Sequence, residues 1–415
     1  MASASHTLIG RKIGVGALRD GAFWEIIRRM IYLDHNATTP LCEEAREAMI
    51  PMLEGSLGNP SGIHGPGRRA RAVIDESRDA IASVLGAKPH EIIFTSGGTE
   101  SCNLGILGLA RRHRTVDKNH LVTVSTEHHA VLHAMQSLAE REGFALTILP
   151  VDAGGRVDPE TFASALHPGT LLASVMIANN ETGVVQPIRE LAAICRERGI
   201  LFHADAVQAF GKIPCFPQEL GVDAFSVAAH KFYGPPGAGF LWLRSGVSIE
   251  SIQHGGFHEN ERRPGTENAI AIAGMAKAAK FAVAEVKEGA EARRQELLRE
   301  RLWSGIHELC PTAVRNSRDM PVIANTLNVS FPGCDGETLL MGLDLEGVAA
   351  SSGSACMVGS IQASHVLLAM GVSTELARGT VRFSLGRHTT EAEIEKAIGA
   401  VARVLSRQAG MMARA

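Results

Sequence analysis

The fold is decided by Ser226-Val227-Ala228-Ala229-His230-Lys231-Phe232-Tyr233-Gly234-Pro235-Pro236-Gly237, a short apolar run that ends in one lysine and then breaks into glycine and proline. Such a pattern is typical of a strand that enters a turn. A lysine at this junction carries its amine on a long flexible stem, and proteins use this arrangement to form a Schiff base with a carbonyl cofactor. The alternative is a surface lysine beside a turn.

Outward from this stretch, apolar strand-like runs alternate with helical patterns. The runs are residues 92–94, 121–124, 145–149, 171–177, 200–203, 224–227 and 239–243. Strands separated by helices indicate right-handed crossovers and a largely parallel sheet covered on both faces. Ligands bind such sheets beyond the carboxyl ends of the strands. We therefore predict an α/β fold with the lysine at the ligand-binding edge of its sheet.

The remainder of the chain predicts a second, smaller α/β domain. A helical pattern over 268–309 breaks near Gly289. Strand-like runs and helical patterns elsewhere cover 31–33, 43–53, 68–85, 326–331, 348–350, 380–383 and 390–407, and an irregular loop is expected over 58–67. The predicted division is an N-terminal extension over 1–30, a large cofactor-binding domain over 46–288, and a small domain made of 31–45 and 289–415.

Composition excludes several classes of function. The chain has 415 residues, long enough for two cores, and its 41 basic and 44 acidic side chains give a net charge of −3. This balance lacks the excess of basic residues that is typical of nucleic-acid-binding proteins. No apolar run approaches the roughly 20 residues that span a membrane. The 7 scattered cysteines form no C-x-x-C pair, which predicts no disulfide framework and no metal site and suits the cytoplasm.

Thr95-Ser96-Gly97-Gly98-Thr99-Glu100 follows a predicted strand and opens a helical pattern. Two glycines expose backbone N–H groups, the helix N-terminus adds positive potential, and Thr99 offers a hydroxyl. The segment is therefore a candidate anion cradle. A tight turn with a helix cap remains the alternative.

Polar residues also follow three other predicted strands. His128 could stack on an aromatic cofactor and exchange protons near neutral pH. Asp205 could pair with a protonated ring nitrogen, and Gln208 could donate to a ring oxygen. Asn180 lies in the corresponding run 179–183. Each of these residues alone could be a structural cap, but together with Lys231 they form a set of candidate site residues.

Two further residues could act on a substrate. Cys356 lies among small residues in 351–357, which suits a nucleophile that must reach a bound molecule. We interpret the other six cysteines as inert. Arg382 could bind a carboxylate with its guanidinium, although arginines at strand ends are also common on surfaces.

Nine segments together resemble the NifS/IscS-like cysteine desulfurases of the class V aminotransferase family. They occur in the family's order: YLDHNATTP, TSGGTES, TEHHAV, NNETGV, HADAVQ, AHKFYGP, RRPGTEN, SSGSAC and RFSLGR. The resemblance covers residues 31–408. It implies the type I fold of pyridoxal-phosphate-dependent transferases, with a mainly parallel seven-stranded sheet in the large domain and a smaller C-terminal α/β domain.

The resemblance also implies how the cofactor, pyridoxal 5'-phosphate, is bound. Lys231 would hold it as a Schiff base and later move protons at the substrate Cα. His128 would stack on its ring and act as acid and base, and Asp205 would pair with its ring nitrogen. Gln208 and Asn180 would orient the ring oxygen and the substrate.

The phosphate would be held by Gly98, Thr99 and His230, with Thr266 reaching in from a second subunit. That last role implies a homodimer whose sites lie at the interface.

The implied reaction converts L-cysteine to L-alanine. Arg382 and Asn180 would bind the substrate, and Cys356 would take up its sulfur as a persulfide. The sulfur would pass to an acceptor protein, such as an iron–sulfur cluster assembly scaffold or a tRNA-thiolation protein. A selenocysteine lyase, an aminotransferase-like enzyme and a weakly active scaffold that binds sulfur-assembly partners are the alternatives.

The chain departs from the family pattern at two places. Ala228 stands where relatives usually carry a serine that binds the phosphate, so we expect weaker cofactor binding. The segment after Cys356, MVGSIQASHVL, has the length of the longer-loop group but differs in composition, including Ala363 where proline is common. This difference bears on the choice of sulfur acceptor.

Overall fold

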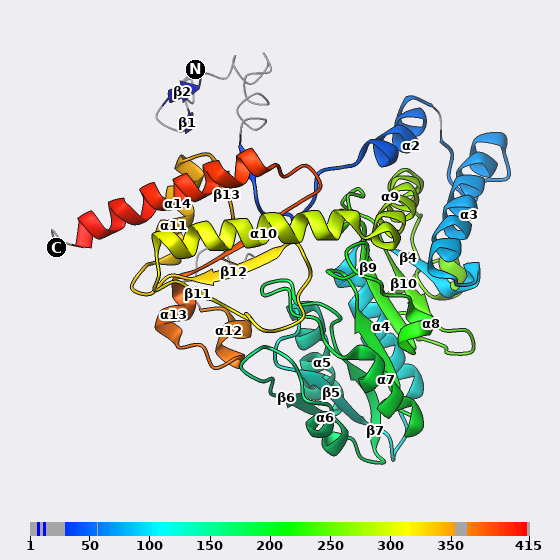
Figure 1. Ribbon diagram of the computed structural model, residues 1–415. Coiled ribbons are helices and arrows are strands. Elements are labelled where there is room, and N and C mark those ends of the chain that lie inside the picture. The colour runs from blue at the N-terminus through cyan, green and yellow to red at the C-terminus, as the bar shows by residue number, and fades with distance from the viewer. Residues whose placement is uncertain (1–5, 9–10, 14–29, 56, 353–362, 413–415) are drawn as a thin grey trace, which may run out of the picture.

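A seven-stranded sheet forms the centre of the larger part of the molecule in the computed structural model, which describes residues 6–8, 11–13, 30–55, 57–352 and 363–412 (Figure 1). Its strand order is β4-β10-β9-β8-β7-β5-β6. The strands are β4 (Ile92–Thr95), β5 (His120–Val124), β6 (Ala145–Leu149), β7 (Thr170–Ser174), β8 (Leu201–Asp205), β9 (Ala224–Ala228) and β10 (Gly239–Leu243). All seven predicted strands are present, and every pairing is parallel except those of β10.

The exception has a simple cause. Only a short 3₁₀ turn, η2 (Ala229–Lys231), and a glycine- and proline-rich loop connect β9 to β10. This connection is too short for the helical crossover that a parallel neighbour requires, so β10 runs antiparallel to β9. The lysine stretch therefore lies at the turn between two central strands.

Helices cover both faces of this sheet. One face packs against α4 (Gly98–His113) and α5 (His129–Glu142), and the other against α2 (Glu43–Glu54), α3 (Gly65–Leu85), α6 (Pro159–Ala165), α7 (Ile188–Glu197) and α9 (Ala269–Glu288), with the short α8 (Pro217–Leu220) beside α7. Strands buried on both sides read as continuous apolar runs, which is the pattern that the sequence shows.

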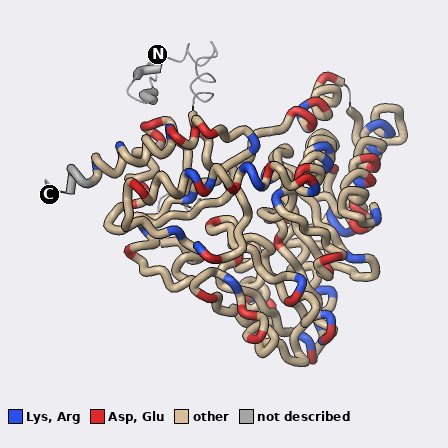
Figure 2. The backbone as a smooth tube through the Cα atoms, in the orientation of Figure 1, with Lys and Arg blue, Asp and Glu red and all other residues tan. Residues whose placement is uncertain are grey.

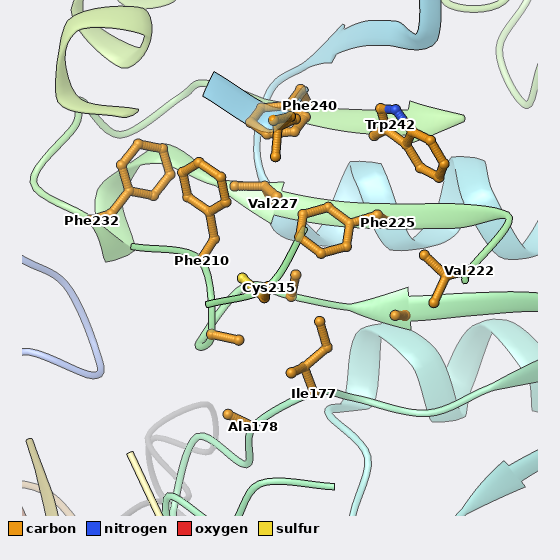
Figure 3. Close-up of a cluster of buried hydrophobic side chains, with 14 of the residues drawn as sticks. Ile177, Ala178, Phe210, Cys215, Val222, Phe225, Val227, Phe232, Phe240 and Trp242 are labelled. Carbon is orange, nitrogen blue, oxygen red and sulfur yellow. The ribbon is translucent and has the colours of Figure 1, made fainter. Parts of the chain in front are cut away.

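Aromatic packing holds the residue after the lysine in place. Phe232 is 1% exposed and meets Phe210 edge-on with ring centroids 4.8 Å apart (Figure 3). Phe210 in turn meets Phe240 of β10 at 5.8 Å. Each such pair contributes about 0.5–1.5 kcal/mol beyond area burial. The backbone at Lys231 is therefore anchored on one side by the hydrophobic core.

The smaller part of the molecule has its own core. The helices α10 (Ala290–Leu309), α11 (Gly336–Leu345) and α14 (Glu391–Met412) lie with a three-stranded antiparallel sheet of β11 (Val314–Arg315), β12 (Thr326–Ser330) and β14 (Thr380–Ser384). The strands β3 (Ile31–Tyr32) and β13 (Val348–Ala349) pair in parallel and belong to the same core. The short helices α12 (His365–Ala369) and α13 (Thr374–Arg378) complete this part of the molecule. The domain boundaries given above stay a prediction.

Helix α3 begins earlier than predicted. Residues 65–67 were expected in the irregular loop, but they form its first turn. His64 caps this turn by accepting a hydrogen bond from Gly67 N at 3.2 Å, and Pro66 fits because the first turn of a helix needs no N–H partner. The predicted break between α9 and α10 is confirmed at Gly289, whose φ is +68°.

Of residues 1–30, β1 (His6–Leu8) and β2 (Arg11–Ile13) form an antiparallel pair, and most of the remainder lies outside the described residues. Acidic and basic residues are interspersed along the chain drawn in Figure 2. Within the described ranges no helix is both long and apolar enough to cross a membrane.

Candidate active site

A cavity of about 340 Å³ lies at the carboxyl ends of β5, β8 and β9. It contains most of the residues predicted from the sequence. These are Gly98, Thr99, His128, Asn180, Asp205, Gln208, His230, Lys231 and Arg382. Its volume is in the range of small-molecule sites. The fold thus brings together predicted residues that lie up to 284 positions apart in the sequence, from Gly98 to Arg382.

Lys231 ends the 3₁₀ turn η2 and reaches towards the segment that follows β3. Its Nζ donates to the backbone oxygens of Asn36 and Ala37, both at 2.7 Å. Because Phe232 is fixed in the core, the lysine stem starts from a rigid point. The amine therefore has a defined resting position on the cavity wall.

The anion cradle lies at the first turn of α4. A Cβ at Gly98 would lie 2.8 Å from Val207 Cγ2 and 3.3 Å from Ala228 Cβ, so any side chain there would fill the cradle. Glu100 is held by Arg263 Nε at 2.7 Å and by Ser96 N at 2.6 Å. Because Gly98 has no side chain, the N-terminus of α4 stays open, and such a helix N-terminus fits a phosphate group.

His128 caps α5 and is held in one tautomer. Its Nδ1 accepts a hydrogen bond from Ala130 N at 3.1 Å, which leaves the proton on Nε2. Burial lowers the pKa of His128, opposed by the nearby charge of Asp205. Burial thus favours the neutral form of this ring, which lines the cavity.

Asp205 is the last residue of β8 and is only 5% exposed. Val207 N donates to its Oδ1 at 2.8 Å. Burial raises the pKa of Asp205, and the charges of His128 and Lys231 oppose this. A buried carboxyl whose charged form is disfavoured gains most from a cationic partner, and a protonated ring nitrogen would be one.

Glu127 adds a second buried carboxyl beside Asp205. Burial, together with the charge of Asp205, raises the pKa of Glu127 well above its usual range. Its Oε1 accepts from Met176 N, while Oε2 has no hydrogen-bond partner among the described residues. Burial and the charge of Asp205 thus favour the protonated form of Glu127.

Arg382 lies in the middle of β14 and is 2% exposed, so the alternative of a surface arginine at a strand end is wrong. Its Nη2 pairs with Asp34 Oδ1 at 2.6 Å, and its Nη1 donates to Asn180 O at 2.9 Å. The buried Nε has no partner within the described ranges. An arginine fixed in this way, with a donor left over, fits an anionic ligand.

Two predicted residues are not in this cavity. Thr266 lines a separate cavity of about 220 Å³ together with Arg263 and Glu267. Cys356 lies outside the described residues, so its predicted role stays a prediction.

Sequence reasoning missed Asn36 and Lys212. Asn36 O accepts from both Lys231 and Gln208, and Asn36 Oδ1 accepts from Lys212 Nζ at 3.0 Å. The polar run 34–40 directly after a short strand was the available signal for Asn36. Nothing in the sequence pattern marked Lys212.

Residues 31–397 match the model of the aminotransferase class V family. The chain belongs to this family. Cysteine desulfurase IscS of Dictyoglomus turgidum is 46% identical over 381 residues, which are 92% of this chain and 96% of that protein. A solved structure of a NifS-like protein is 37% identical with a TM-score of 0.84, over 91% of this chain and 99% of the other.

A second solved structure, of SspA in complex with cysteine, is 35% identical with a TM-score of 0.76, over 87% of this chain and 100% of that one. The predicted family, the type I transferase fold and the class of a pyridoxal-phosphate-dependent enzyme are therefore confirmed for this class V aminotransferase.

Proposed function

We propose that this class V aminotransferase is a cysteine desulfurase, which converts L-cysteine to L-alanine and retains the sulfur as a persulfide on Cys356. The observation that carries the proposal is the convergence of Lys231, His128, Asp205 and Arg382 on one cavity. It is supported by relatives that bear the name cysteine desulfurase over nearly their whole length.

The cavity residues would hold pyridoxal 5'-phosphate in one orientation. Gly98 and Thr99 would bind its phosphate with the N-terminal N–H groups of α4, assisted by His230. Asp205 would pair with the ring nitrogen, and His128 would stack on the ring. The bound group supplies an electron sink for charge that develops at the substrate Cα.

The chain's own residues would then bind the substrate and move its protons. Arg382 would hold the carboxylate through its guanidinium, with Asn180 beside it. Lys231 would take the proton from Cα, and His128 would exchange protons with the substrate through Nε2.

Sulfur transfer is assigned to Cys356. Its thiolate would attack the substrate sulfur, the bond between Cβ and sulfur would break, and the sulfur would remain on Cys356 as a persulfide. A proton delivered to Cβ and a proton returned to Cα, for which Lys231 is the candidate donor, would complete alanine. A reducing agent or an acceptor protein would then remove the sulfur.

The proposal is tested by measuring alanine and sulfide that the purified holoenzyme releases from L-cysteine in the presence of a reducing agent. Equal amounts of both products are expected. A protein that shows cofactor absorbance but forms no alanine from L-cysteine would contradict the assignment. Alanine formation with selenide from L-selenocysteine alone would instead favour the selenocysteine lyase.

Cofactor affinity offers a test of the position of Ala228. Its Cβ faces Gly98 at the phosphate cradle, so the change Ala228→Ser places a hydroxyl donor there. One additional hydrogen bond contributes about 0.5–1.5 kcal/mol, which lowers the Kd for pyridoxal phosphate about 2- to 10-fold. Titration of the apoenzyme measures the Kd. An unchanged Kd would contradict the prediction, and Ala228→Val is the control without a hydroxyl.

We also propose a homodimer in which Thr266 of one subunit completes the phosphate site of the other. The proposal is supported by the position of Thr266 outside the cavity that contains the other phosphate-binding candidates of its own chain. Mixing subunits that carry Lys231→Ala with subunits that carry Thr266→Val should restore about one quarter to one half of wild-type activity, since mixed dimers keep one intact site. A monomeric sedimentation coefficient, or no recovery on mixing, would contradict it.

The acceptor and the compartment are proposals as well. An acceptor protein, such as an iron–sulfur scaffold or a tRNA-thiolation protein, would take the sulfur in the cytoplasm. The six cysteines in the described ranges are all free, which suits a reducing compartment.

A further inference from the structure

Lys212 lies beside the cavity but has no role in the reaction proposed above. It follows Gln208 by four residues, and its Nζ donates to Gln208 Oε1 at 2.7 Å and to Asn36 Oδ1 at 3.0 Å. Burial lowers the pKa of Lys212 well below its usual range, and the positive charges of Lys231 and Arg382 lower it further. Burying an amine at this position costs free energy, so the hydrogen bonds that hold Lys212 there need an explanation.

Two hydrogen bonds, one of them from Lys212, decide which way the amide of Gln208 points. A side-chain amide has nearly the same shape in both orientations, so only its partners select one. Lys212 donates to Oε1, and Gln208 Nε2 donates to Asn36 O at 2.8 Å. The same oxygen of Asn36 accepts from Lys231. Lys212, Gln208, Asn36 and Lys231 thus form one connected network at the cavity wall.

We propose that Lys212 is a positioning residue that fixes the amide of Gln208 with its N–H side at the cavity. Lys212 also holds Asn36, whose backbone oxygen accepts from Lys231. The inference rests on the proposed function, because Gln208 is assigned there to the ring oxygen of pyridoxal phosphate. Without Lys212 only the bond to Asn36 O selects the orientation of the amide, so the amide can turn more readily and present an acceptor to that anionic oxygen.

This role predicts a change in the pH dependence of the bound cofactor's visible absorbance. The absorbance reports the proton on the nitrogen that joins the cofactor to Lys231. The ring oxygen needs an external N–H most when that nitrogen has lost its proton, because the protonated nitrogen itself donates to the oxygen. Loss of the oriented Gln208 N–H therefore favours the protonated form and raises the pH midpoint.

Other charged groups near Lys212 could act on the same midpoint through space. They are Lys231 and Arg382 on the side of the cavity, and His35, Tyr233, Glu291 and the Glu285–Arg387 ion pair, which line a neighbouring cavity of about 40 Å³ with Lys212. A double-mutant cycle separates a through-space effect from one that passes through Gln208.

The experiment titrates the absorbance of the substrate-free holoenzyme for wild type, Lys212→Met, Gln208→Met and the double variant. Each single change should raise the midpoint by about one pH unit, the value expected for one hydrogen bond. The double variant should shift no further than Gln208→Met alone. An unshifted midpoint in Lys212→Met, or additive shifts in the double variant, would overturn the proposal.

Controls keep the test independent of folding and of the proposed activity. Thermal unfolding and cofactor content are measured for each variant, and Lys212→Arg, which keeps N–H donors, is expected to titrate near wild type. If Lys212→Met does not fold, a full shift in Lys212→Arg overturns the proposal and a midpoint near that of wild type supports it. Because no L-cysteine is present, the titration can succeed even if alanine formation fails, and the two proposals fail separately.

Discussion

Lys231→Ala is expected to lower kcat/KM for alanine formation from L-cysteine at least about 10³-fold. The change removes the amine that would bind the cofactor covalently and the base that would take the Cα proton. The substituted position stays anchored, because Phe232 is packed in the core next to it. Steady-state alanine assays with saturating pyridoxal phosphate measure the loss.

Two controls sharpen this test. Lys231→Arg keeps a positive charge but offers no nucleophilic amine, so it should be as inactive as Lys231→Ala. Lys277→Ala removes an exposed lysine on α9 and should behave as wild type. Activity above one tenth of wild type in Lys231→Ala would contradict the role of this lysine.

Cys356→Ser is expected to lower the rate of sulfur transfer at least about 10²-fold, because a hydroxyl is a far weaker nucleophile than a thiolate near neutral pH. The variant should still bind pyridoxal phosphate and show the pH-dependent absorbance of wild type, since Lys231 is intact. Mass spectrometry of the wild type after brief exposure to L-cysteine should find one additional sulfur atom on the peptide that contains Cys356.

The matched control is Cys310→Ser, which changes a half-buried cysteine outside the cavity and should leave the rate unchanged. An additional sulfur on a different cysteine, or full activity in Cys356→Ser, would assign the nucleophile elsewhere. Loss of cofactor absorbance in Cys356→Ser would also be contrary to prediction, because cofactor binding is assigned to Lys231 and only sulfur transfer to Cys356.

Much of the larger fold follows from local pattern. Strands buried on both faces are mostly apolar, so runs such as 171–177 and 224–227 were visible without any tertiary information. The carboxyl ends of parallel strands meet at one edge, which explains why His128 and Asp205 were found as site candidates. The start of α3 was missed because its first turn consists of Gly65, Pro66 and Gly67, which are all turn formers in sequence statistics.

Other parts of the site carry no local signal. Lys212 reads as an ordinary lysine after a turn, and its role arises only because β3 and β8 bring Asn36 and Gln208 together. Arg382 was predicted as a carboxylate-binding residue, but its burial against Asp34, 348 residues away, had no signal in the surrounding sequence. Such contacts depend on which segments the fold places side by side.

Motif order and the periodicity of buried residues can be read along the chain, and they were enough to predict the family, the cofactor and the mainly parallel sheet. The antiparallel direction of β10 and the interior position of Arg382 became visible only in the folded molecule. It alone shows that Thr266 lies outside the cavity that contains the other phosphate-binding candidates, and that Lys212 and Lys231 both donate hydrogen bonds to Asn36. The physical reason is that hydrogen bonding and burial of a polar side chain depend on partners from distant segments, which no single stretch of sequence contains.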